Sequence, residues 1–373
     1  MEVIFENLGN LQWQQVVMWV IGGILIYLAI KKDMEPTLLL PLGFGAILVN
    51  LPLSGAVTQI TNGTTEVGVI DTLFNAGIAN ELFPLLLFIG IGAMIDFTPL
   101  LSNPKMLFFG AAAQFGIFFT FSMASLFGFD IKDAASIGII GAADGPTSIF
   151  VANFFNSNYI GAIVVAAYSY MALVPIIQPT VIKALTTKKE RLIRMPYNPG
   201  EVSKMAKILF PIVITVIAGL VAPKSVALIG FLMFGNLLRE CGVLNSLSQS
   251  AQKELANIIT LLLGITISSK MRAEDFLTLN TLLIMGLGLV AFIFDTAGGV
   301  LFAKVINLFS RKKMNPMIGA AGISAFPMSA RVVHKMGLKE DPQNFLLMHA
   351  AGANVAGQIS SVIAGGLIIG LLS

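Results

Sequence analysis

The chain has 373 residues, of which 56% are hydrophobic and only 12% are charged, with a formal net charge of +3 at pH 7. A soluble domain carries about 25% charged residues, so this composition excludes an ordinary soluble protein. A small positive charge is typical of basic residues gathered in cytoplasmic loops, and it gives no indication of nucleic-acid binding. The single cysteine, Cys241, excludes an internal disulfide and a cysteine-based metal site.

Apolar runs recur along the whole chain. Because these runs are continuous rather than alternating, they predict membrane-spanning helices and not a barrel. The first ten residues lack the basic start of a secretory signal, so we expect no cleavable signal peptide. The predicted spans are 14–30, 37–53, 82–97, 104–127, 159–182, 207–221, 225–238, 255–269, 277–308 and 344–372.

Two further apolar segments, 134–155 and 314–333, are interrupted by Gly and Pro. Basic residues favour the cytoplasmic side, which puts the N-terminus outside and the basic linker 183–206 inside. Only one crossing can separate the outer link before residue 134 from this linker, so 134–155 and 159–182 cannot both span the membrane. We therefore predict that 134–155 is a re-entrant broken hairpin. The same argument makes 314–333 a second one.

The two interrupted segments also share a Gly-x-x-Gly element that is followed at the same spacing by Pro and Ser, which indicates a duplication. Each half then holds about five spans and one hairpin, and an odd number of spans makes the halves inverted. The fold class predicted is an all-α polytopic membrane protein, with a first inverted repeat at 1–182, the cytoplasmic basic linker at 183–206 and a second repeat at 207–373. The matched positions are Gly138, Gly141, Pro146 and Ser148 in the first segment and Gly319, Gly322, Pro327 and Ser329 in the second.

Asp144 lies in the middle of the first apolar segment. A carboxylate at membrane depth costs about 2.5–3.5 kcal/mol on insertion scales, so it is rarely found there without a compensating group. The Gly145-Pro146 pair that follows breaks the helix and frees backbone carbonyls. A carboxylate beside unwound backbone predicts a cation site. Its alternative roles are a proton carrier and a structural partner for a buried Arg.

The second segment supplies neutral oxygens instead. Asn315, Ser324 and Ser329 carry side-chain oxygens, while Gly319 and Gly322 permit close approach of the backbone. A hard cation such as Na⁺ binds several ligands of this kind. For each serine, helix packing is the alternative interpretation.

Other polar residues extend this set. Arg331 ends the second segment, either as an interfacial Arg or as a clamp for a carboxylate. Asn354 is flanked by glycines in the last span, where an interruption of the helix would place its amide beside bound ions. Tyr168 and Tyr170 face different sides of one helix, so at most one of them is expected to face the site, where a hydroxyl donates a proton or binds a cation.

These motifs resemble the β subunit of the sodium-pumping biotin-dependent decarboxylases, a family that includes the oxaloacetate, methylmalonyl-CoA and glutaconyl-CoA enzymes. The resemblance covers nearly the whole chain, and its Asp-Gly-Pro block is highly specific. The stretches that carry it are Gly141-Ala-Ala-Asp144-Gly-Pro-Thr-Ser-Ile-Phe150, Ala166-Ala-Tyr-Ser-Tyr-Met-Ala-Leu-Val-Pro175, Asn315-Pro-Met-Ile-Gly319, Ser324, Arg331 and Asn354-Val-Ala-Gly357.

The resemblance implies a membrane subunit that decarboxylates carboxybiotin and couples this reaction to outward Na⁺ transport with consumption of a proton. It implies three partners, namely a carboxyltransferase α subunit, a biotin carrier subunit and a small single-span membrane subunit, and it leaves a homo-oligomer open. Carboxybiotin would be presented by a partner and not attached to this chain. The location implied is the bacterial cytoplasmic membrane, with multiple passes.

The resemblance also assigns roles to individual residues. An alternative to the whole assignment is a Na⁺- or H⁺-coupled secondary transporter of a small organic anion, because such transporters share this architecture. Co-purification with a biotinylated chain would discriminate between the two. The residues implied as catalytic are Asp144, Tyr170 and Arg331, with Arg331 also binding the biotin carboxylate, and the implied Na⁺ ligands are Asp144, Asn315, Gly319, Ser324 and Asn354.

Overall fold

The computed structural model describes residues 9–61, 64–196 and 201–373. This part of the chain is almost entirely helical, with one short antiparallel pair of strands. The expectation about a signal peptide falls largely on residues 1–8, and the predicted linker includes 197–200, both of which lie outside the described residues. The prediction of an all-α membrane protein is confirmed.

Every predicted span contains at least one helix. The first half forms α2 (Trp13–Lys32), α3 (Pro36–Val49), β1 (Gln59–Thr61), β2 (Thr64–Glu66), α4 (Val69–Gly77), α5 (Leu82–Met94), α6 (Thr98–Ser102), η1 (Pro104–Met106), α7 (Leu107–Ala113), α8 (Phe115–Leu126), α9 (Ile131–Gly138), η2 (Ile139–Ala142), α10 (Gly145–Phe154) and α11 (Ile160–Leu185). The second half forms α12 (Lys188–Arg191), α13 (Lys204–Val221), η3 (Pro223–Ser225), α14 (Val226–Glu240), α15 (Asn245–Ser250), η4 (Ala251–Leu255), α16 (Ala256–Ile267), η5 (Ser268–Lys270), α17 (Ala273–Phe276), α18 (Leu279–Phe309), α19 (Met317–Ala320), α20 (Met328–Glu340) and α21 (Leu347–Leu372).

Among the described residues, five helices are long and apolar enough to cross a membrane, and seven if each of two bent pairs counts as one span. The bent pairs are α4 with α5, at 61°, and the two parts of α11, at 67°. Helices such as α3, with 14 residues, are shorter than the roughly 20 residues that a full crossing needs. The inverted arrangement of ten spans and two hairpins stays a prediction.

One local expectation is wrong. The glycines around Asn354 do not interrupt the last span, because α21 runs unbroken from Leu347 to Leu372. Neighbouring backbone packs against this part of α21 on both sides, so the small residues there permit close approach of other helices. Polar side chains of α21 therefore reach the interior from a regular helix.

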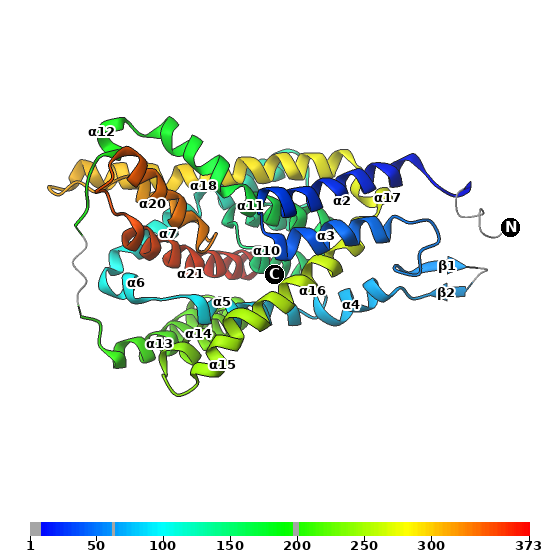
Figure 1. Ribbon diagram of the computed structural model, residues 1–373, viewed down its shortest axis with the longest axis horizontal. Coiled ribbons are helices and arrows are strands. Elements are labelled where there is room, and N and C mark those ends of the chain that lie inside the picture. The colour runs from blue at the N-terminus through cyan, green and yellow to red at the C-terminus, as the bar shows by residue number, and fades with distance from the viewer. Residues whose placement is uncertain (1–8, 62–63, 197–200) are drawn as a thin grey trace.

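The contacts between helices divide them into two groups. Figure 1 shows α13 and α14 of the first group below α20 and α21 of the second. The first group consists of α2, α3, α5, α13, α14 and α16, and the second of α7, α8, α11, α18, α20 and α21. Helix α10 packs on α5 of the first group as well as on α11 and α21 of the second. The break that precedes α10 therefore lies at the seam between the groups.

Glycines set the closest helix crossing in the first group. A Cβ on Gly92 of α5 would overlap the carbonyl oxygen of Leu232 on α14. In return, a Cβ on Gly235 of α14 would overlap the carbonyl oxygen of Ile89 on α5. Apolar side chains gain nothing over lipid tails in a bilayer, so such close backbone packing is a main source of helix association there.

Gly92→Val should lower the stability of the detergent-solubilised protein, because the α5–α14 crossing would have to open. Overpacking of this kind costs about 1–3 kcal/mol, which a lowered thermal unfolding midpoint would report. Gly23→Ala is the control, since a Cβ there meets nothing within 4 Å. Equal midpoints for the two variants would contradict the close crossing.

Candidate functional site

The site begins at the break in the first interrupted segment. Helix α9 passes into the 3-10 turn η2, after which Ala143 adopts a left-handed conformation with φ 52°. Asp144 is the N-cap of α10 and accepts hydrogen bonds from the backbone nitrogen of Thr147, at 3.3 Å, and from its hydroxyl, at 2.8 Å. Proline at the first turn of α10 suits a helix start and no helix interior. The helix break and the proline thus place the Asp144 carboxylate between the end of η2 and the start of α10.

Two other parts of the chain, α21 and the second interrupted segment, direct donors at the same carboxylate. Its Oδ2 atom accepts from the Ser361 hydroxyl at 2.8 Å, the Gln358 amide at 3.1 Å and the Ser324 hydroxyl at 3.3 Å. Asp144 is only 3% exposed, so these bonds replace the water it has lost. Each hydroxyl also has lone pairs and can turn them toward a cation. The arrangement therefore suits either a bare carboxylate or a carboxylate with a bound ion.

The two interrupted segments touch at this point. The backbone nitrogen of Ser324, in the second segment, donates to the carbonyl of Ala142, in the first, at 3.1 Å. Next to it, the Asn354 amide donates to the Ile323 carbonyl at 2.7 Å. The Asn354 Oδ1 atom is buried and has no hydrogen-bond partner among the described residues. The structure thus brings together Asp144, Ser324 and Asn354 from the predicted set.

A cavity of about 240 Å³ lies beside Asp144, between the two helix groups. Tyr168 on α11 borders it, and the Tyr168 hydroxyl is buried and has no hydrogen-bond partner in the described part of the chain. The Tyr170 hydroxyl instead donates to the carbonyl of Met285 on α18. Tyr168 rather than Tyr170 therefore faces the carboxylate. The other polar residues that border the cavity are Glu35, Thr37, Asn257, Thr260, Ser324 and Gln358.

Gly319 lies away from this cavity and serves close packing. A Cβ on it would overlap the carbonyl oxygen of Gly299 on α18. Gly319 does not border the cavity beside Asp144. Its predicted role as a Na⁺ ligand stays a prediction.

Asn315 also lies away from the cavity, where it anchors the linker between the halves. Its amide nitrogen donates to the carbonyls of Arg191, at 2.8 Å, and Ile193, at 3.0 Å. Asn344 donates to the same Arg191 carbonyl at 3.0 Å, and the Arg191 side chain pairs with Glu340 at 2.7 Å. The linker is therefore held against the second interrupted segment by buried amides.

Ion pairs also join the linker to the second half of the chain. Arg194 bonds to Asp341 and holds the pKa of that carboxyl below its usual value. Lys304 pairs with Glu190 at 3.2 Å. Exposed pairs of this kind contribute little to stability, so the buried amides carry most of the anchoring.

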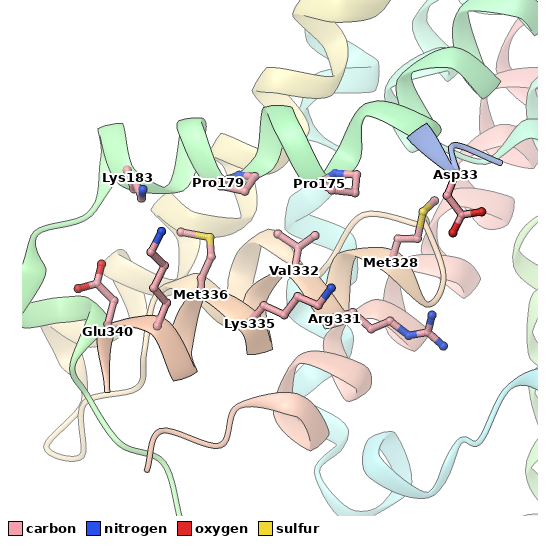
Figure 2. Close-up of a pocket in the computed structure, with 11 residues that line it drawn as sticks. Asp33, Pro175, Pro179, Lys183, Met328, Arg331, Val332, Lys335, Met336 and Glu340 are labelled. Carbon is pink, nitrogen blue, oxygen red and sulfur yellow. The ribbon is translucent and has the colours of Figure 1, made fainter. Parts of the chain in front are cut away.

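A second opening, of about 470 Å³, lies between α11 and α20 (Figure 2). We call it the basic groove. Arg331 lines it, together with the apolar side chains of Pro175, Pro179 and Val332 on its two walls. The charged residues that line it are Asp33, Lys183, Arg331, Lys335, Lys339 and Glu340. Four cations against two carboxylates favour an anionic ligand with an apolar body.

Sequence reasoning missed several of these residues. Ser361 lies one helical turn beyond Gln358 on α21, and that spacing was the available signal. Asp295 is a second fully buried carboxylate, and it lies beside the start of α8, where a Cβ on Gly116 would overlap its Oδ1 atom. A Cβ on Gly141 would lie 2.7 Å from its Oδ2 atom, so the first segment packs directly on it. Its signal was a lone acid inside a predicted span, and neither of its carboxylate oxygens has a hydrogen-bond partner among the described residues.

Comparison with known proteins gives a consistent picture. Residues 14–372 match the sequence model of the family described as Na⁺-transporting oxaloacetate decarboxylase beta subunit. The chain is 48% identical to methylmalonyl-CoA decarboxylase subunit beta of Propionigenium modestum, over 98% of this chain and 95% of that protein. It is 49% identical to glutaconyl-CoA decarboxylase subunit beta of Acidaminococcus fermentans, over 96% and 94%. It is 45% identical to the probable oxaloacetate decarboxylase beta chain of Vibrio cholerae, over 97% and 96%.

Asn315→Ala should loosen the linker, because it removes two buried hydrogen bonds. A loss of about 1.4 kcal/mol raises the open population about tenfold, so trypsin should cleave the basic linker about ten times faster. Asn280→Ala is the control, since it removes an exposed contact with Tyr159 elsewhere. Identical cleavage rates for the wild type and Asn315→Ala would show that Asn315 does not anchor the linker.

Proposed function

The chain belongs to the family of β subunits of Na⁺-transporting decarboxylases, and on this premise we propose that it decarboxylates carboxybiotin and couples this reaction to outward Na⁺ transport with consumption of a proton. The observation that carries the proposal is the Asp144 carboxylate, which is buried at the meeting point of two broken segments and is surrounded by reorientable oxygen ligands. A cavity reaches it from the seam between the helix groups.

The ion would bind at Asp144. One carboxylate balances one monovalent charge, and the hydroxyls of Ser324 and Ser361 supply neutral oxygens. The Asn354 amide nitrogen donates to the carbonyl of Ile323, the residue before Ser324, and its Oδ1 atom, which has no partner among the described residues, is a further candidate ligand. Moving this charge against about 100 mV costs about 2.3 kcal/mol before any concentration gradient, so the site needs a chemical source of free energy.

Carboxybiotin, presented by a partner subunit, would bind in the basic groove. Arg331 would pair with its carboxylate, and the apolar walls would contact its ring and chain. In the reaction the bond between the ureido nitrogen and the carboxyl carbon breaks, CO₂ leaves, and the nitrogen takes up one proton. The reaction thus consumes a proton, so proton uptake and Na⁺ transport are coupled to the same chemical step.

The remaining features follow from this assignment. The names of the relatives, subunit beta and beta chain, indicate multi-subunit enzymes. We infer that this chain works with a carboxyltransferase α subunit, a biotin carrier and a small single-span membrane subunit in the bacterial cytoplasmic membrane. We also infer that segments 134–155 and 314–333 enter the membrane from opposite sides as parts of an inverted repeat, so that their breaks meet at Asp144.

Asp144→Asn tests the ion site, because it keeps the size of the side chain and removes its charge. The isolated chain in detergent should decarboxylate free carboxybiotin in a Na⁺-dependent manner, and the variant should lose about 10–100-fold of that rate. Asp133→Asn, immediately before this segment, should behave like the wild type. Persistence of Na⁺-dependent decarboxylation in Asp144→Asn would rule out the ion site.

Arg331→Ala tests the groove. Loss of a charged hydrogen bond to the carboxylate costs about 1.5–3 kcal/mol, so the KM for free carboxybiotin should rise by about 10–100-fold. Arg331→Lys should recover part of this loss, because Lys keeps the charge but not the two-pronged geometry. The control is Arg311→Ala, which lies outside the groove. An unchanged KM in Arg331→Ala would place the ligand elsewhere.

A further inference from the structure

Asp295 is a buried carboxyl group that the proposed ion site does not use. It lies near the middle of α18, is fully buried, and has no hydrogen-bond partner at either oxygen among the described residues. Asp144, by contrast, accepts hydrogen bonds from several hydroxyls. An ionised carboxylate without such partners is so costly in an apolar interior that the group takes up a proton instead. Asp295 is therefore a neutral acid with a proton to give.

The elements that pack on α18 leave this acid without an ionisable partner. Four of them, α7, α8, α19 and η2, contain no ionisable side chain. Lys304, farther along α18, pairs with Glu190. The ionisable residues of the other two elements are Lys132 and Asp133 in the first turn of α9, Tyr168 beside the ion cavity, Tyr170 on the Met285 carbonyl and Lys183 in the basic groove.

Other buried polar atoms without partners lie on α18 and on the two helices with which it makes most contact. They are the hydroxyls of Thr296 on α18 and Thr120 on α8, and the amide oxygen of Gln178 on α11. Thr120 lies one turn beyond Gly116, which packs against Asp295. Internal water supplies partners to buried polar groups where the protein does not. This part of the interior is therefore suited to hold water between hydroxyls.

Gln178 connects this part of α18 to the second interrupted segment. A Cβ on Gly299, one turn beyond Asp295, would lie 3.5 Å from the backbone nitrogen of Ala320. The Gln178 amide donates to the carbonyl of the same Ala320 at 2.6 Å and to the Ser329 hydroxyl at 2.7 Å. Gln178 is fully buried, so these two bonds hold its side chain between α18 and Ser329.

Ser329 lies behind the wall of the basic groove. Met328, the residue before it, lines the groove, and so does Arg331, two residues after it. A hydroxyl and a water molecule each donate and accept hydrogen bonds, which is what the transfer of a proton along a chain requires. The buried polar groups thus extend from Asp295 to the proposed place of decarboxylation.

We propose that Asp295 supplies the proton that decarboxylation consumes, by way of Thr296, internal water and Ser329. The proposal rests on the proposed function, because that reaction creates the demand for a proton. The O–H bond of Asp295 breaks, an N–H bond forms on the ureido nitrogen that CO₂ has left, and solvent returns one proton to Asp295 from the side of Thr120. Proton supply and ion binding then use two different carboxyl groups.

Asp295→Asn tests the relay, because it keeps the size of the side chain and removes the acid. With free carboxybiotin and the full-length chain in detergent, kcat should fall at least about tenfold. The KM and the Na⁺ concentration for half-maximal rate should stay as in the wild type. The solvent deuterium isotope effect on kcat should increase, because proton delivery becomes limiting. Asp295→Glu, which keeps the acid, should recover part of kcat.

Thr296→Val is the second variant, and it should lower kcat about threefold because it removes one hydroxyl of the relay. Neither Asp295 nor Thr296 loses a hydrogen bond to a described residue on replacement, so the thermal unfolding midpoint should not fall. Thr180→Val is the matched control. Its hydroxyl is exposed on α11 and bonds within its own helix, so this variant should keep the wild-type kcat.

The outcomes separate this inference from the proposed function. A wild-type kcat in Asp295→Asn overturns the relay, even if Asp144→Asn abolishes Na⁺ dependence as expected. A fall in kcat with a lower unfolding midpoint and an unchanged isotope effect makes Asp295 structural and also overturns it. If Asp295→Asn cannot be purified, Thr296→Val decides, and a wild-type kcat there rejects the relay. Decarboxylation that is independent of Na⁺ in the wild type would instead reject the proposed function itself.

Discussion

The structure depends on one electrostatic constraint, which is a carboxylate buried in an apolar interior, with no basic residue among the described residues that line the cavity beside it. Asp144 can remain there only if polar groups replace its lost hydration. Those groups come from α10, α21 and the second interrupted segment, so satisfying one side chain requires three distant parts of the chain to converge. The break before α10, the contact between the two segments and the unbroken course of α21 all serve that convergence.

Local sequence signals predicted the features that depend on local physics. Proline after Asp144 removes a backbone donor wherever it occurs, so the helix break was predictable, as were the long apolar runs. Partners from distant positions were not. Ser361, Tyr168 and Glu35 reach the Asp144 region only through packing of the two helix groups, which no local pattern encodes. Likewise, Asn315 has the chemistry of an ion ligand, but its amide donates to the backbone of the linker.

The glycines near Asn354 and the buried Asp295 show the same limit on what the sequence predicts. Glycines near Asn354 resembled a break, yet they permit close packing within a regular helix. Asp295 lies in a span that hydropathy alone predicted, and its position beside the start of α8 becomes visible only in the folded chain. In both cases the composition predicted that the segment lies in the membrane, but it did not predict which neighbouring helix would contact each residue.

The donors around Asp144 have a consequence for the speed of ion exchange. Three of them, Thr147, Ser324 and Ser361, are hydroxyls, and a hydroxyl changes from donor to acceptor by rotation about one bond. Side-chain torsions of this kind relax within picoseconds to nanoseconds when they are free to move, far faster than helices shift. The carboxylate can therefore exchange its hydrogen bonds for an ion while the backbone stays still. Loading of the site and rearrangement of the helices are then separable events that occur on different timescales.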